Sequence, residues 1–319
     1  MASARSWALA VAAVALAAPS VRGEGSISVV AAGLQSPHAV AAVRLPSDRL
    51  RRGVFFGDLA SGGLSIALED SGEPTVVLRA NPLAGATRID CAQLGESLML
   101  VGQADASTGG RRLEVFQLGV SRRVRLQQVD SPPDEDEAQF TSFGPLLVDA
   151  TFVHRIAEVG GRTVILRGRH AGGMVSMPRR LPDSGEPALS GVPVAAVLRG
   201  DAELTLAIQD GDACRLVFAH VAGSGLSSVV ALPLDLRGVR SLRYAPSAAT
   251  PRLYALAADG LYRLDAAVGE DDDLNIAATK VQPLDNPQSM DFAAADVLYV
   301  TRGGLGGDGV ELLRIDGDF

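Results

Sequence analysis

Short apolar strands separated by glycine and aspartate turns recur along this chain, and the clearest copies lie near its C-terminus. Residues 252–265 and 297–316 each contain an apolar and aromatic strand, a Gly/Asp turn, a second alternating strand and a closing Leu-Asp or Ile-Asp pair. The Leu-Tyr pairs in these copies begin at Leu253 and Leu298, 45 residues apart. A repeat of this length that consists of short strands is typical of the blades of a β-propeller.

The same strand-turn-strand pattern predicts four further copies upstream. Their first strands begin at Val54, Leu98, Val164 and Leu204. The six starts are separated by 44, 66, 40, 49 and 45 residues, so one interval is clearly longer than the others. That interval contains the stretch SPPDEDEAQ, whose prolines and acids predict a solvated insertion loop at about residues 130–140. A degenerate seventh blade in the same interval is the alternative.

A further pair of strands precedes each copy, as in residues 27–42 and 278–294. The first strand of the pair would be the outermost of one blade and the second the innermost of the next. This order gives four strands per blade and predicts an all-β, six-bladed β-propeller. The strand at 26–31 has no blade before it, so we expect it to join the last blade and close the ring. A two-domain β-sandwich arrangement is the competing interpretation.

The composition agrees with a turn-rich all-β protein. Hydrophobic residues make up 47% of the 319 residues, which is enough for a large core, and there are 35 glycines and 17 prolines. The net charge of -8 disfavours nucleic acid as a partner. Cys91 and Cys214 are the only cysteines and fall in different predicted blades, so we expect two separate buried thiols and no disulfide between them.

The N-terminus has the features of a signal peptide. Arg5 gives a positive start, residues 7–18 form the apolar stretch WALAVAAVALAA, and Val21-Arg22-Gly23 resembles a cleavage site. As a helix this stretch would rise about 18 Å, less than the ~30 Å of a bilayer core. We therefore expect a signal peptide at 1–23 and a secreted or periplasmic, monomeric domain at 24–319 without a membrane span. An uncleaved anchor is the alternative.

A family resemblance begins at residues 33–42, GLQSPHAVAA, which are followed by the strand VFFGD ending at Asp58. This segment resembles the opening of NHL-type and SMP-30/gluconolactonase-like six-bladed propellers, and the resemblance extends over nearly the whole chain after residue 24. It implies the fold more strongly than any activity. In the SMP-30 type of lactonase, carboxylate and amide oxygens hold a divalent metal such as Ca²⁺ in the channel.

The channel residues expected from this resemblance only partly match such a metal site. The family's first acidic ligand is replaced by Gln35, and asparagine occurs only three times. Acids on the expected inner strands, which could converge on the channel, are Asp90, Asp149 and Asp291. We favour solvated or paired side chains over metal ligands at these positions, which disfavours a metal-dependent lactonase. The complete set of candidate channel or ligand-binding residues is Gln35, His38, Asp58, Asp90, Asp149 and Asp291.

A second resemblance concerns His170, which begins the sequence HAGG. Secreted quinoprotein sugar dehydrogenases are also six-bladed and have a His-x-Gly-Gly motif that contains a catalytic base, a role that suits histidine. The resemblance therefore makes His170 a candidate base with pyrroloquinoline quinone (PQQ) as cofactor. The repeat, however, places HAGG in a hairpin turn, and Gly-Gly is common there. We favour the hairpin and do not expect PQQ.

These observations favour an exported propeller that acts as a binding or scaffold module. Its ligand, a small molecule or a protein or peptide, would lie at one mouth of the channel, where the loops of all blades meet. No cofactor is assigned. The alternatives are an SMP-30-like hydrolase with Ca²⁺ or another divalent metal and a PQQ-dependent sugar dehydrogenase.

Overall fold

The protein is described by a computed structural model, in which five sheets, antiparallel except for one pair of strands, account for nearly all described residues. The predicted signal peptide and insertion loop lie outside those residues. Within them, no helix is long and apolar enough to cross a membrane. The described residues are 25–34, 37–44, 52–58, 63–68, 75–79, 86–94, 97–105, 111–118, 124–130, 140–171, 174–176, 179–182, 187–200, 202–222, 225–246, 251–268, 273–303 and 310–319.

Two four-stranded sheets follow each other in the first part of the chain. The first consists of β2 (Pro37–Arg44), β3 (Arg52–Asp58), β4 (Gly63–Leu68) and β5 (Thr75–Arg79). The second consists of β6 (Ala86–Leu94), β7 (Ser97–Asp105), β8 (Arg111–Leu118) and β9 (Val124–Asp130). In both sheets each strand pairs with the next one in the sequence, which is the order expected from the repeat.

The third sheet contains β10 (Phe140–Val148), β11 (Phe152–Val159) and β12 (Arg162–Ala171). Two short strands, β13 (Met174–Val175) and β14 (Arg179–Arg180), both pair with β12 and complete this sheet. A single turn of 3₁₀-helix, η3 (Pro187–Leu189), follows and is the only helical element among the described residues.

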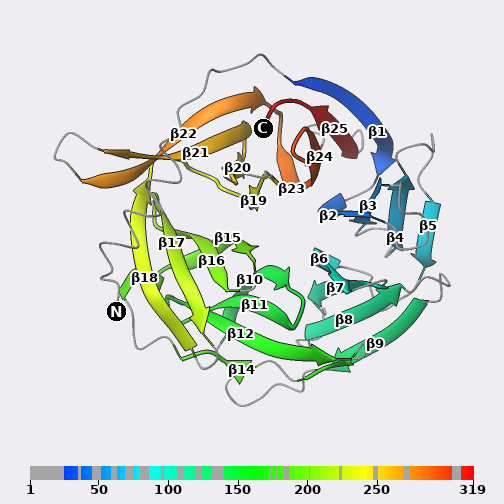
Figure 1. The fold of residues 1–319 in the computed structure, drawn as a ribbon, viewed down its shortest axis with the longest axis horizontal. Helices are drawn as coiled ribbons and strands as arrows, with labels where there is room; N and C mark the ends of the chain where they lie inside the picture. The colour runs from blue at the N-terminus through cyan, green and yellow to red at the C-terminus, as the bar shows by residue number, and fades with distance from the viewer. Residues whose placement is uncertain are drawn as a thin grey trace.

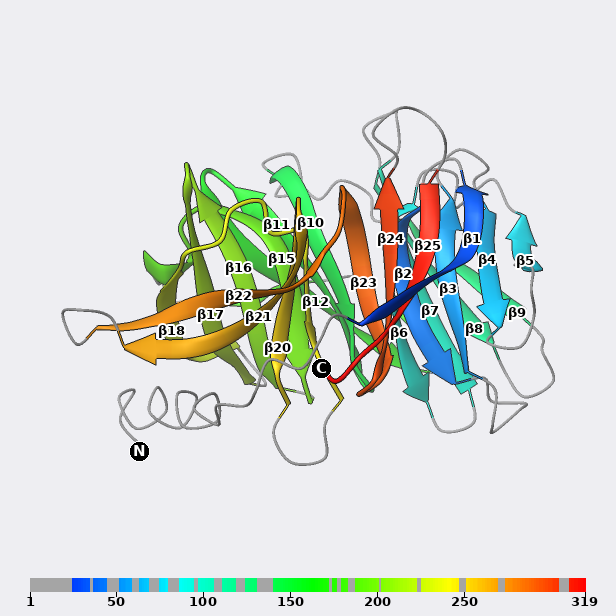
Figure 2. The same cartoon turned by 90° about the horizontal axis from the view of Figure 1, so that it is seen from above.

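The next eight strands form one continuous sheet, which runs in the order β15-β16-β17-β18-β22-β21-β20-β19. Its first half consists of β15 (Val192–Arg199), β16 (Glu203–Asp210), β17 (Ala213–Ala222) and β18 (Gly225–Leu234). Its second half consists of β19 (Ser241–Tyr244), β20 (Leu253–Ala257), β21 (Gly260–Val268) and β22 (Leu274–Pro283). A single parallel pair, Leu234 with Ile276, joins β18 to β22. Figure 2 shows the β21–β22 hairpin reaching toward β18.

The last sheet joins the two ends of the chain. Its strands are β23 (Pro287–Ala294), β24 (Val297–Gly303), β25 (Val310–Asp316) and β1 (Ser26–Leu34). β1 lies antiparallel to β25, with Ser26 opposite Asp316 and Leu34 opposite Val310. The N-terminal strand therefore pairs with the C-terminal one, as the repeat predicted.

The sheets lie around a central axis (Figure 1). The strands nearest to this axis form a closed ring of contacts in the order β2, β6, β10, β15, β19, β23 and back to β2. Each of these inner strands is an edge strand of its sheet. Its second edge therefore presents backbone N–H and C=O groups that need partners other than a neighbouring strand of the same sheet.

The hydrophobic core lies between successive sheets and explains the repeated Leu-Tyr pair. Leu253 packs in the cluster formed with β15–β18, whereas Tyr254 points to the other side and packs with the last sheet. In the next copy, Leu298 belongs to the cluster that contains Tyr254, and Tyr299 packs against Val40 of the first sheet. Because adjacent residues of a strand point to opposite faces, each Leu-Tyr pair contributes to two neighbouring interfaces.

The prediction that one repeat copy begins at Val164 is wrong by one strand. Val164 lies in β12, the third strand of its sheet, and the strand before it is β11. If the copy begins at Val153 of β11 instead, it starts 55 residues after Leu98 and 51 residues before Leu204. The slip arose because the Gly-Gly pairs at 160–161 and 172–173 are equally good turn signals. Every described strand between Leu98 and Val164 belongs to the second or third sheet.

The two cysteines lie on strands of different sheets, β6 and β17. Cys214 is a free thiol, as predicted, but it is half-buried and not fully buried. Burial raises the pKa of this thiol to about 11, and only part of the effect is offset by the neighbouring Arg215. The thiol is therefore protonated, and poorly nucleophilic, at neutral pH.

We expect Cys214 to react slowly with iodoacetamide in the folded protein. With a pKa of about 11, roughly one thiol in a thousand is ionised at pH 8, against about a quarter for an ordinary cysteine. In a Cys91→Ser variant, labelling measured by mass spectrometry should be roughly a hundred times slower in the folded chain than in urea. Its rate should rise steadily from pH 8 to pH 10. Equal rates for the folded and unfolded chain would contradict the shifted pKa.

Candidate functional site

Three of the predicted channel residues lie on three different inner strands. His38 lies near the start of β2, Asp90 within β6 and Asp291 within β23. Asp58 is the last residue of β3 and pairs with Pro37, so it belongs to a second strand and not to an inner one. Gln35 lies outside the described residues.

Asp291 connects three inner strands of the ring. Its Oδ1 accepts a hydrogen bond from Nε of Arg243 on β19, at 2.9 Å. Its Oδ2 accepts a hydrogen bond from the backbone N–H of Ala42 on β2, at 2.7 Å. Ala42 lies on an inner edge strand, where a backbone donor needs a partner from another sheet. Both carboxylate oxygens are thus engaged in contacts that hold neighbouring sheets together.

The environment of Asp291 is largely shielded from water. The exposed fractions of the Asp291 and Arg243 side chains are 17% and 15%. Burial raises the pKa of the Asp291 carboxyl above its usual range, and the Arg243 guanidinium and the Ala42 amide oppose only part of this rise. A carboxyl with these partners serves as a connection between sheets, because each of its oxygens accepts a hydrogen bond from a neighbouring inner strand.

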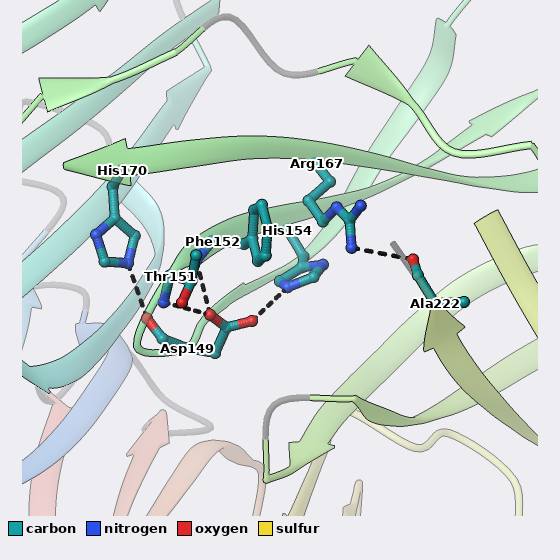
Figure 3. A network of polar contacts seen from close by, with 7 residues as sticks. All are labelled: Asp149, Thr151, Phe152, His154, Arg167, His170 and Ala222. Carbon is teal, nitrogen blue, oxygen red and sulfur yellow. Dashed lines mark hydrogen bonds and ion pairs between the residues drawn. The ribbon is translucent and has the colours of Figure 1, made fainter. Parts of the chain in front are cut away.

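Asp149 was expected on an inner strand, but it lies directly after β10, in the turn that leads to β11. The strand ends here because Oδ1 accepts hydrogen bonds from the backbone N–H groups of Thr151 and Phe152, both at 2.6 Å. This pattern of side chain to backbone bonds is typical of an aspartate that forms a turn. Oδ2 contacts Nε2 of His154 at 2.8 Å, as Figure 3 shows.

The Asp149 carboxylate is stabilised in its ionised form. Burial raises the pKa of Asp149, but the hydrogen bonds from His154, Thr151 and Phe152 outweigh this and bring it below the usual value. An ionised carboxylate only accepts hydrogen bonds, so Nε2 of His154 must hold the proton that it donates. The His154 side chain is fully buried, and its Nδ1 has no hydrogen-bond partner among the described residues.

His170 contacts the same turn, the one that begins at Asp149. It pairs with Val175 across the β12–β13 hairpin, which agrees with the turn expected for HAGG. Its Nε2 lies 2.9 Å from the backbone oxygen of Asp149, to which it donates, and the residue is only 6% exposed. A general base must lie within reach of a substrate, and a ring that is this deeply buried is poorly accessible. The ring instead connects two turns at one end of the third sheet (Figure 3).

Asp149 and Asp291, the two predicted acids whose side chains the structure describes, are not part of a metal centre among the described residues. Among the described residues, no three His, Cys, Asp or Glu side chains lie close enough to hold a metal ion. Asp149 and Asp291 have separate partners, one at a turn and the other between inner strands. A metal ion would require several converging oxygen ligands.

The sequence analysis missed a polar network where β19 and β23 begin. Nη1 of Arg240 donates to Oδ1 of Asn286 at 2.7 Å and to the backbone oxygen of Pro287 at 2.8 Å. Nε2 of Gln288 donates to the same Asn286 oxygen at 2.9 Å. The sequence contains a signal for this network. The segments RSLRY and QSMDF, which begin at Arg240 and Gln288, occupy equivalent positions in the repeat, and each begins with a polar residue.

Comparisons with known proteins support the fold. No protein-family model matches the sequence, and no curated protein gives a significant match. Many solved structures do match. A putative oxidoreductase (glucose dehydrogenase) from Thermus thermophilus is 15% identical, with a TM-score of 0.56, over 91% of this chain and 99% of that one.

Two further structures represent different activities on a similar architecture. The PQQ-bound aldose sugar dehydrogenase from Streptomyces coelicolor is 13% identical, with a TM-score of 0.52, over 94% of this chain and 100% of that one. The fucose-recognising lectin from Aleuria aurantia, a six-bladed β-propeller, is also 13% identical, with a TM-score of 0.50, over 88% of this chain and 92% of that one. At these identities the likeness concerns the fold alone. The chain has a β-propeller fold.

Proposed function

We propose that this protein is an exported six-bladed β-propeller that acts as a binding module. Its ligand would lie at the mouth of the channel where the inner strands begin. The observation that supports this most directly is that the described candidate groups for catalysis are engaged within the fold. Asp291 holds Arg243 and a backbone amide, while His170 donates to the Asp149 turn.

The number of blades follows from how the eight-stranded sheet is divided. β18 and β22 share only one pair, Leu234 with Ile276, whereas the pairs within each half extend along whole strands. If this contact is a bridge between two blades, the ring contains six blades of four strands. Each of the six inner strands then begins one blade, and β1 completes the last.

An enzymatic function is the second candidate, because two of the similar structures are sugar dehydrogenases. His170 as base for PQQ is disfavoured because its Nε2 is bonded to the backbone of Asp149 and the residue is only 6% exposed, which restricts the approach of a substrate to the ring. A metal site of the SMP-30 type is disfavoured as well, since no three His, Cys, Asp or Glu side chains converge among the described residues and Asp291 is bonded to Arg243 and Ala42. The NHL and SMP-30-like relationship therefore supports the proposal only as a common fold.

The cellular location and the partners form part of the same proposal. The apolar stretch at 7–18 and the site at 21–23 support cleavage of a signal peptide and export of a monomeric domain. A small molecule or a peptide could occupy the mouth. A small polar molecule agrees best with the polar network at the starts of β19 and β23.

The binding function can be tested with purified mature protein. We expect saturable binding to some members of a library of carbohydrates and small organic acids, measured by calorimetry. A Gln288→Trp variant should lose this binding by filling the mouth. An Ala295→Trp variant should retain it, because Ala295 is exposed at the opposite end of β23.

The same preparation tests the enzymatic alternative. We expect no oxidation of glucose with added PQQ and no hydrolysis of gluconolactone with added Ca²⁺. Turnover that disappears in a His170→Asn variant but persists in a variant of the exposed His220, His220→Asn, would refute the binding proposal. A complete lack of binding to the library, or equal binding by both tryptophan variants, would also count against it.

A further inference from the structure

Arg240 lies at the end of the inner ring where strand β19 begins. It immediately precedes β19, and its backbone N–H donates to Leu256. The side chain is half-buried and extends to the start of the next inner strand, β23. Its Nη1 lies 2.7 Å from Oδ1 of Asn286 and 2.8 Å from the backbone oxygen of Pro287.

The charge of Arg240 has no acidic partner in the part of the chain that the structure describes. Both groups that accept its hydrogen bonds, an amide oxygen and a backbone carbonyl, are neutral. Several other arginines have a carboxylate within reach. These pairs are Arg199–Glu203, Arg215–Asp210, Arg243–Asp291, Arg263–Asp265, Arg302–Glu311 and Arg314–Asp316. The guanidinium of Arg240 is therefore an oriented cation without a counterion from the described residues.

The two contacts also determine which donors remain. A guanidinium has five N–H donors in one plane, and two of them are on Nη1. The bonds to Asn286 and Pro287 use these two. The Nε–H and the two N–H groups of Nη2 are left, and Nε with Nη2 forms the edge that binds a carboxylate through two parallel hydrogen bonds.

Asn286 holds Arg240 in a preorganised position. Its backbone has a φ of 47°, in the left-handed region that residues other than glycine rarely adopt. Its Nδ2 donates to the backbone oxygen of Gly303 at 3.2 Å, and the N–H of Gly303 donates back to its carbonyl at 3.1 Å. Gln288 binds the same Oδ1 that receives Arg240. Asparagine is enriched in this conformation among the non-glycine residues, and the contacts with Gly303 and Gln288 hold its amide in place.

We infer that Arg240 forms the anion subsite of the channel mouth and binds the carboxylate of a small organic acid. This inference rests on the proposed binding function and specifies its ligand class. One guanidinium edge pairs with one carboxylate through two parallel hydrogen bonds and matches its single charge. Phosphate and sulfate can use the same edge, but a single guanidinium neutralises only part of their charge. The overall charge of -8 also disfavours multivalent anions.

The test measures binding of acetate, lactate and gluconate to the mature protein by calorimetry at low ionic strength. We expect millimolar or tighter binding of at least one of them and weaker binding of sulfate and phosphate. Arg240→Gln should weaken carboxylate binding about 10- to 100-fold, the range for loss of a charged hydrogen-bonded contact. The matched control is Arg263→Gln, whose arginine is paired with its own Asp265. It should change Kd less than twofold.

A second variant keeps the inference testable if Arg240→Gln does not fold. Asn286→Asp places a carboxylate next to Arg240 without a change in size, so it should neutralise the subsite and weaken binding while the thermal melting curve stays cooperative. Absence of carboxylate binding, or an unchanged Kd in a folded Arg240→Gln variant, would overturn the inference. If neutral members of the library still bind and Gln288→Trp abolishes their binding, only the carboxylate subsite fails. If nothing binds, the binding proposal fails as well.

Discussion

A mature chain that lacks residues 24–33 is expected to yield no soluble folded monomer. The deletion removes nearly all of β1, which pairs with β25 from Ser26 to Leu34. Each lost backbone hydrogen bond costs about 0.5–1.5 kcal/mol net, and the burial of Ala31 is lost as well. The sum of these losses approaches the whole free energy of unfolding of a domain, about 5–15 kcal/mol. The deletion also exposes the edge of β25, which favours aggregation.

The measurement is the yield of monomer by size-exclusion chromatography, combined with circular dichroism. The matched control begins at Glu24, which removes the predicted signal peptide but retains β1, and it should give a folded monomer. A synthetic peptide of residues 24–34, added during refolding of the truncated chain, should restore part of the yield. A truncated chain that remains monomeric and melts cooperatively would show that the ring does not need β1.

Substitution of Asp291 by alanine is expected to lower the free energy of unfolding by about 3 kcal/mol. The change leaves the Arg243 guanidinium without its carboxylate and the Ala42 amide without its acceptor. Removal of one partner of a buried ion pair typically costs about 3–5 kcal/mol. We expect a cost at the lower end of this range because the side chains of Asp291 and Arg243 remain 17% and 15% exposed. Urea unfolding at pH 7 measures the difference.

Two further variants separate this contact from a general effect of removing an acid. Glu203→Ala breaks an ion pair whose side chains are 40% and 44% exposed, so it should cost less than about 1 kcal/mol. In the double variant Arg243→Met/Asp291→Leu, much of the lost stability should return, because no unpaired charge remains buried. A cost for Asp291→Ala as small as that of Glu203→Ala would mean that the contact between the inner strands contributes little.

Most of the strand order could be predicted from the sequence because the signals are local. Alternating apolar residues and Gly/Asp turns determine where strands begin and end, and the repeated Leu-Tyr pair shows which strands are equivalent. The error at Val164 shows the limit of such signals. Two Gly-Gly turns twelve residues apart, at 160–161 and 172–173, fit the same pattern. Only the pairing of β10 with β11 decides between them.

The candidate site could be predicted only in outline. Asp291 was placed on an inner strand from its repeat position, but its partners lie 48 and 249 residues away in the sequence. No local pattern reports contacts across such separations. Asp149 was expected on a strand because the apolar run before it gives no sign of where pairing stops. Its bonds to Thr151 and Phe152 end the strand instead.

The sequence by itself determined the class of fold and the pairing of its two ends, because periodicity and turn chemistry depend on neighbouring residues. Only the tertiary structure decided how the polar side chains are used, because those contacts form between strands that the ring brings together. It engages Asp291 and His170 in structural bonds. It leaves Arg240 oriented at the channel mouth by neutral partners, since the acids that compensate other arginines are not placed beside it.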